Sequence, residues 1–147
     1  FFIAFKSKFF DEPMDAVIYI ITAALGFSAM ENTLYIFRDL ATGGAFEILA
    51  NGNMRFIGAT IVHIVSSAFI GIAIAFSFYA PKYIKFIAVT LGIFTATLLH
   101  AYFNLSIMVS DGTMKTLLVF SQFWGAIIGI IVLLALVKRI PRPESIN

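Results

Sequence analysis

Three ionisable side chains lie inside long apolar stretches of this 147-residue chain: Glu31, His63 and His100. A carboxylate and two imidazoles are groups that proteins use to activate water, to move protons or to bind zinc. Because an ionisable group in hydrocarbon is costly, such residues normally face a protein interior or a watery cavity and mark chemistry or transport. A fourth, Asp15, lies two residues after Pro13, so charge complementarity at a helix start explains it about as well as function does.

The composition of the chain indicates the environment of these residues. Hydrophobic residues make up 61% of the chain and charged residues 12%, with a mean hydropathy of +0.98, which indicates an integral membrane protein. The chain has no cysteine, so disulfides, thiolate nucleophiles and cysteine metal sites are excluded.

Four apolar stretches are long enough to cross a bilayer as helices, which need about 20 residues each. They predict helices at about 13–38, 55–79, 83–109 and 114–138, and there is no ten-residue alternation of the kind that barrel strands show. The expected fold class is therefore all-α, a polytopic membrane helix bundle in a single domain over residues 1–147. Residues 1–10 are too short to span and are interpreted as the end of a truncated upstream helix.

Basic residues predict how the bundle is oriented. The positive-inside rule makes the face with more lysine and arginine cytoplasmic, so the basic tail is expected inside the cell membrane. Seven basic residues fall on one predicted face and three on the other: Lys6, Lys8, Lys82, Lys85, Lys138, Arg139 and Arg142, against Arg38, Arg55 and Lys115. The excess of basic residues is thus explained by the orientation of the helices in the membrane, and the net charge of +2 does not indicate nucleic-acid binding.

The three buried ionisable residues are predicted to share one layer of the bundle. With a rise of ~1.5 Å per residue, Glu31 lies about 10 Å, His63 about 12 Å and His100 about 13 Å from the outer ends of their helices. Helices of alternating direction would then bring them together near the extracytoplasmic face. Scattered structural polar residues would not be expected to coincide in depth.

Neighbours at helical spacing make the predicted layer polar. Phe27 and Tyr35 lie one turn to either side of Glu31, and Asn104 lies one turn beyond His100. On the stripe of His63, a small residue at Gly71 allows a neighbouring helix or a substrate backbone to come close.

Two further features are structural expectations. Residues 39–53, DLATGGAFEILANGN, are expected to form an outer loop that folds as a short interfacial helix or a lid. Small residues at four-residue spacing in the last helix, Ser121, Gly125 and Gly129, are typical of close helix packing.

Residues 11–104 resemble the PrsW-type intramembrane proteases, relatives of the type II CAAX prenyl proteases in the CPBP superfamily. The resemblance is carried by DEPMDAVIYIITAALGFSAMENTLY, by Arg55 with seven residues to His63 and seven more to Gly71, and by HAYFN. The motifs of the family match at these positions: Phe27, Glu31 and Tyr35; His63; His100 and Asn104.

Two departures shape what the resemblance implies. The family's paired glutamate, the presumed water-activating base, is absent and would lie just upstream of Phe1, in the same outer layer. The CAAX proteases have a phenylalanine four residues before the middle histidine, whereas this chain has Ala59, which favours the PrsW branch over prenylated substrates.

The resemblance implies a glutamate-type endopeptidase without a cofactor. The missing glutamate, Glu31 and His63 would bind and activate water, while His100 and Asn104 would hold the oxyanion. Phe27, Tyr35 and Arg55 are expected to support the site. Zinc held by Glu31, His63 and His100 is the metal alternative, although no HExxH pair is present.

Two other classes of function stay open at this point. One is a small transporter or an ion or proton relay subunit that uses the same residues, although such proteins typically show helices broken at mid-membrane. The other is a non-catalytic membrane scaffold. For the protease, the expected partner is a single-span membrane protein, cut near the outer face as in regulated proteolysis of anti-sigma factors.

Overall fold

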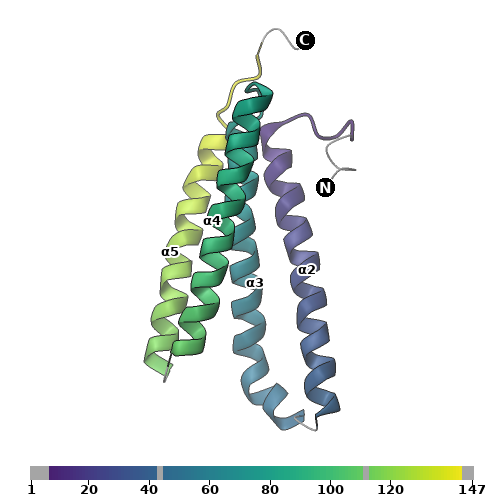
Figure 1. The fold of residues 1–147 in the computed structure, drawn as a ribbon, viewed down its shortest axis with the longest axis vertical. Coiled ribbons are helices and arrows are strands. Elements are labelled where there is room, and N and C mark those ends of the chain that lie inside the picture. Colours follow the sequence, from purple (N-terminus) through teal and green to yellow (C-terminus); the bar gives the residue numbers. More distant parts are fainter. Residues whose placement is uncertain (1–6, 43–44, 111–112, 144–147) are drawn as a thin grey trace.

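The computed structural model describes residues 7–42, 45–110 and 113–143; of residues 45–55 and 113 it describes the backbone alone. Within these ranges the chain forms four long helices and no strand (Figure 1). They are α2 (Pro13–Ala41), α3 (Ala45–Phe76), α4 (Lys82–Val109) and α5 (Thr113–Val137). The all-α prediction is confirmed.

Each of the four helices is long and apolar enough to cross a membrane. They lie side by side and are joined alternately at opposite ends, so the chain is a multi-pass membrane protein (Figure 1). Helix α3 packs against α2, α4 and α5, and its spanning part, Phe56–Phe76, is the most buried of the four. The central helix therefore positions the other three.

The start of α2 explains Asp15. Its Oδ2 accepts hydrogen bonds from the backbone N–H groups of Glu12, at 2.8 Å, and of Asp11, at 3.1 Å. These are N–H groups that a helix start leaves without partners inside the helix, so Asp15 serves to begin α2.

The connection between α2 and α3 differs from the predicted outer loop. Helix α2 continues to Ala41 and α3 already begins at Ala45, so residues 45–53 are helical and continuous with the part of α3 that is long and apolar enough to cross a membrane, Phe56–Phe76. A single glycine inside a helix costs only about 1 kcal/mol, so Gly52 does not interrupt it. The pair Gly43 and Gly44, which helped to suggest a loop, lies outside the described residues.

Two glycines set the close approach of α3 to its neighbours. A Cβ added to Gly71 would lie 2.8 Å from Cα of Val17 in α2. A Cβ added to Gly92 of α4 would lie 3.0 Å from Cβ of Ala73 and 3.2 Å from Cα of Ile70, both in α3. Lipid is as apolar as the helix surfaces, so such backbone contact, and not hydrophobic burial, holds membrane helices together.

The small residues of α5 behave differently. No described atom outside the surrounding turns of α5 lies within 4 Å of a Cβ added to Gly125 or Gly129. The close packing predicted for this stripe is therefore not formed within the described chain. The reason is rotational: α5 buries Val119, Phe123 and Ile130, which lie on the opposite side of the helix.

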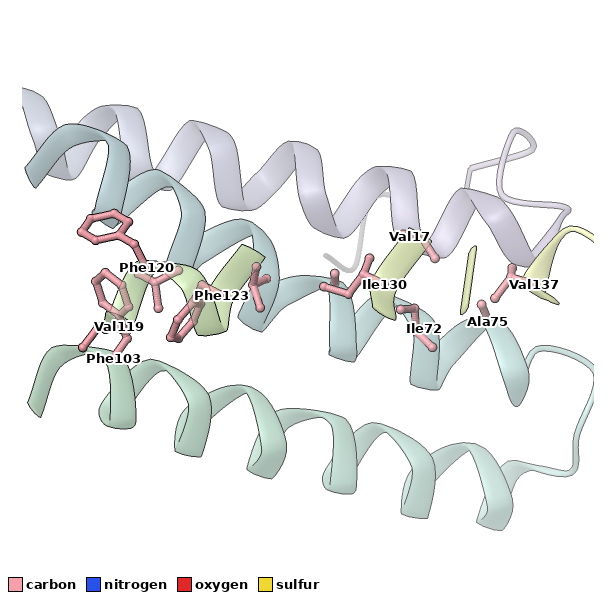
Figure 2. Packing of buried hydrophobic residues seen from close by; sticks show 12 residues of the cluster. Val17, Ile72, Ala75, Phe103, Val119, Phe120, Phe123, Ile130 and Val137 are labelled. Atoms are coloured by element: carbon pink, nitrogen blue, oxygen red, sulfur yellow. The ribbon is translucent and has the colours of Figure 1, made fainter. Parts of the chain in front are cut away.

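The main apolar cluster runs along the bundle and changes character from one end to the other (Figure 2). At one end, small and branched side chains such as Val17, Ala75 and Val137 fill the space. At the other end three rings gather: Phe103 is edge-on to Phe120, with centroids 5.9 Å apart, and to Phe123 at 4.7 Å. This aromatic end of the core adjoins the candidate site.

Candidate functional site

His63 lies on the face of α3 between the side packed on α2 and the side packed on α4. Its Nε2 is 2.8 Å from Oε2 of Glu31, in α2. Its ring is 4.8 Å, centroid to centroid, from the ring of His100 in α4. The prediction that these three residues share one layer is confirmed.

The two partners of the short contact differ in exposure. The His63 side chain is 10% exposed, whereas that of Glu31 is 35% exposed. The carboxylate thus holds a buried imidazole on one side while part of it remains open on the other. A charge-assisted hydrogen bond of this length fixes both groups, and the pair becomes a salt bridge when His63 is protonated.

Phe27 completes the surroundings of His63. Its ring stands edge-on to the imidazole with centroids 5.2 Å apart, and it lies one turn before Glu31 on α2. The His63 ring is therefore in contact with Phe27 on α2 and His100 on α4, in addition to its hydrogen bond. Three helices are needed to hold it.

A polar cluster next to Glu31 fixes the register of α2 on α3. The hydroxyls of Ser28 and Thr60 are 3.2 Å apart, and Nδ2 of Asn32 lies 3.4 Å from Ser28 Oγ. Ser28 and Asn32 are buried. Hydrogen bonds between membrane helices stabilise their association, so this cluster keeps Glu31 opposite His63. The sequence analysis missed its role, although a serine and an asparagine four residues apart inside a span were a usable signal.

The three ionisable residues line a cavity of about 420 Å³ between the helices. Glu31, His63, His100 and Asn104 supply most of its polar lining, and Tyr35 also contributes. The rest of the wall is mainly apolar: Gly58, Ala59, Val62, Phe103, Ile107, Met108 and Phe120, with Thr116. A partly open space beside the Glu31–His63 pair has room for water and for part of a polypeptide.

The structure places some of the other residues singled out in the sequence and leaves one of them outside the described side chains. Asn104 lines the cavity one turn from His100, as expected. Tyr35 is placed beneath the guanidinium of Arg38, whose Cζ lies 4.5 Å from the ring centroid. Arg38 forms its ion pair with Asp39, at 2.9 Å, and not with Glu31. The side chain of Arg55 lies outside the described residues, so its predicted supporting role is not placed.

The possible metal-binding atoms belong to a hydrogen-bonded pair, Glu31 and His63, and to a neighbouring imidazole, His100, whose ring is tilted by 59° from that of His63. Nε2 of His63 is directed at the Glu31 carboxylate, and among the side chains that the structure describes no three of His, Cys, Asp or Glu are placed to hold one metal ion. The set of one carboxylate and two imidazoles has the chemistry of a zinc site but not, in this arrangement, its geometry.

Comparisons with known proteins identify the family of this chain. Residues 1–137 match the model of the family described as PrsW family intramembrane metalloprotease. A protein named Protease PrsW, from Geobacillus kaustophilus strain HTA426, is 29% identical over 83 residues, which is 56% of this chain and 32% of that relative. The aligned part thus spans about a third of the relative's length. No solved structure matches. Because the family model covers more than half of the chain, the chain belongs to the PrsW family of intramembrane proteases.

Proposed function

We propose that this protein is an intramembrane endopeptidase of glutamate type that cleaves membrane-anchored proteins near the outer face of the membrane. The observation that carries the proposal is the 2.8 Å contact between Glu31 and His63, both of which line a cavity within a bundle of helices long and apolar enough to cross a membrane. Membership of the PrsW family supports peptide hydrolysis as the chemistry. By the same resemblance, anti-sigma factors are among the proposed substrates.

The first step is the activation of a water molecule. His63, held by Phe27 and His100, donates its Nε2–H to Glu31 and orients the carboxylate towards the cavity. Glu31 accepts a proton from the water, whose oxygen forms a bond to the carbonyl carbon of the substrate peptide. The upstream glutamate that the resemblance implies would share this role with Glu31.

The second step is the collapse of the tetrahedral intermediate. Its oxyanion accepts hydrogen bonds from a ring N–H of His100 and from the side-chain amide of Asn104, which lie one turn apart on α4 and both line the cavity. The carbon–nitrogen bond then breaks, and the proton on Glu31 passes to the leaving amine nitrogen. Glu31 is thereby restored as a carboxylate.

The family description names a metal, and the described residues do not offer it a site. The metal alternative of Glu31, His63 and His100 is distinguished from the glutamate type by the effect of a chelator on cleavage. Continuous helices also favour hydrolysis over transport, because transporter sites are typically built from helices broken near mid-membrane. In the described ranges α2, α3 and α4 each run unbroken through the layer of the site.

Replacing His63 or His100 with alanine is expected to lower cleavage of a single-span substrate by at least about 100-fold. A lost oxyanion donor or water-orienting group typically costs about 10²–10³-fold in rate. The measurement is cleavage by the full-length protein in liposomes, with a panel of single-span substrates analysed by gel and mass spectrometry. His variants that cleave like the wild type would remove His63 and His100 from the proposed mechanism, and a wild type that cleaves no substrate would overturn the peptidase proposal.

Two controls accompany this assay. Phe94→Ala removes a lipid-facing ring that is 61% exposed and should leave cleavage unchanged. A chelator should leave the activity intact, since the proposed mechanism uses no metal. Activity lost to the chelator and restored by zinc would overturn the glutamate mechanism and leave a metal-dependent peptidase.

Orientation is proposed from the distribution of basic residues, with the α3–α4 turn in the cytoplasm. The chain has no cysteine, so single cysteines report sidedness without background. A membrane-impermeant maleimide applied to intact cells should label Met114→Cys, at the start of α5, and should not label Lys82→Cys, at the start of α4. Both positions are exposed, so the opposite pattern would invert the proposed topology.

A further inference from the structure

The cavity is lined by apolar as well as polar residues. Five of its apolar lining residues come from three helices and lie near the proposed reaction centre or near one another: Gly58, Val62, Phe103, Ile107 and Phe120. Val62 is 2% exposed, Phe103 5% and Phe120 8%, so this wall is packed into the core. It is a rigid surface and not a flexible lipid-facing one.

The apolar wall stands at a fixed distance from the proposed reaction centre. Phe103 lies three residues after His100 on α4, and Val62 directly precedes His63 on α3. At ~1.5 Å per residue, these steps along the helix axes are about 4.5 Å and about 1.5 Å. Both are within the reach of an amino-acid side chain from its own peptide carbonyl. A substrate whose carbonyl lies between Glu31 and His100 would therefore direct a neighbouring side chain at this wall.

Gly58 allows two rings of the cavity lining to pack directly on the backbone of α3. A Cβ added there would lie 3.1 Å from Cζ of Phe120 and 3.2 Å from Cζ of Phe103. Phe103 is in turn packed edge-on against Phe123, so the rings have little room to withdraw. Any larger residue at position 58 would therefore displace these rings and change the shape of the cavity.

We propose that Gly58, Val62, Phe103, Ile107 and Phe120 form a side-chain subsite that selects substrates with an apolar residue flanking the cleaved bond. The inference rests on the proposed peptidase function and adds the substrate class. A charged or amide side chain would find no hydrogen-bond partner on these five residues, and burying an unpaired polar group is costly. Aliphatic and aromatic side chains bury their surface there without such a penalty.

The test uses a single-span substrate whose cut bond has been mapped by mass spectrometry. The residues flanking that bond are changed in turn to alanine, leucine, phenylalanine and aspartate, and initial rates are measured with the full-length protein in liposomes. At the position that enters the subsite, leucine is expected to exceed alanine by about tenfold or more, as in apolar pockets generally. Aspartate there should be cut least.

Two variants should move this preference in opposite directions. Gly58→Ala narrows the subsite. It should lower the ratio of the cleavage rate of the phenylalanine substrate to that of the alanine substrate by about tenfold. Phe120→Leu enlarges the subsite and should raise the same ratio of phenylalanine to alanine cleavage rates. The matched controls are Gly125→Ala, where nothing lies within 4 Å, and Phe94→Leu on the lipid face. Neither control should change the ratio.

The outcomes separate this inference from the proposed function. Cleavage with no preference between leucine and aspartate at either flanking position would overturn the subsite and leave the peptidase standing. So would Gly58→Ala and Phe120→Leu proteins that change all rates by one common factor. No cleavage of any substrate by the wild type would overturn the proposed function itself. Because rate ratios are compared, a partly destabilised variant still gives a valid answer.

Discussion

Glu31→Gln is expected to reduce peptide-bond cleavage by about 10²–10⁴-fold, the range that a positioned general base contributes. Glutamine keeps the shape of the side chain and can still form a hydrogen bond with His63, but its amide accepts no proton from water. The loss should therefore appear in the rate constant for cleavage more than in substrate affinity. Single-turnover cleavage in liposomes measures the two separately.

Asp39→Asn provides a closely matched control for this change. Asp39 lies on the same helix, its side chain is 35% exposed like that of Glu31, and it also has a basic partner, Arg38, at 2.9 Å. The substitution makes the same chemical change away from the cavity. Unchanged cleavage by Asp39→Asn beside full loss in Glu31→Gln is the expected result; wild-type cleavage by Glu31→Gln would remove the proposed base from the mechanism.

Gly71→Leu is expected to give the largest loss of folded protein, although residue 71 does not line the cavity. A Cβ at this position would meet a backbone atom, Cα of Val17, at 2.8 Å, and no side-chain rotation can relieve that clash. Overpacking typically costs about 1–3 kcal/mol, here by pushing α2 away from α3. Glu31 and His63 are on those two helices, so cleavage should fall with the stability.

The matched change is Gly26→Leu, because no atom outside its own turns lies within 4 Å of a Cβ at Gly26. The protein's melting temperature in detergent and its cleavage activity should stay near the wild-type values in this variant. If Gly71→Leu behaves like Gly26→Leu, the close approach of α2 and α3 does not set the geometry of the site.

The depth of the site residues could be predicted from the sequence because depth follows from a constant rise per residue. Counting inward from the helix ends placed Glu31, His63 and His100 in one layer, and their contacts confirm it. No knowledge of packing was required for this step. The roles assigned to these residues stay predictions until cleavage is measured.

Rotation about each helix axis could not be predicted in the same way. In a membrane the faces towards lipid and towards protein are both apolar, as Phe27, Met30 and Leu34 illustrate by being more than 60% exposed on α2. Hydrophobic periodicity therefore does not identify the packed face. The same small-residue signal marks a real contact at Gly71 and open surface at Gly125.

Side-chain pairings between or next to the site residues were also not predictable from the sequence. Arg38 forms its ion pair with Asp39, the next residue along the chain. The register of α2 on α3 depends on Ser28 and Thr60, whose 3.2 Å contact joins positions 32 residues apart. Spacing along one helix does not reveal such a pairing. It becomes visible only when both helices are in place.

The position of His63 has a consequence for the protein during its synthesis and insertion into the membrane. The imidazole is held by residues from α2 and α4 while it belongs to α3, so no pair of these helices reproduces its surroundings. During synthesis, a chain that has inserted only α2 and α3 already carries Glu31 and His63 but lacks His100 and the apolar wall. On the proposed mechanism, the oxyanion donors on α4 are missing until the third of these helices has entered the bilayer, so a partly inserted chain is not expected to cleave peptide bonds.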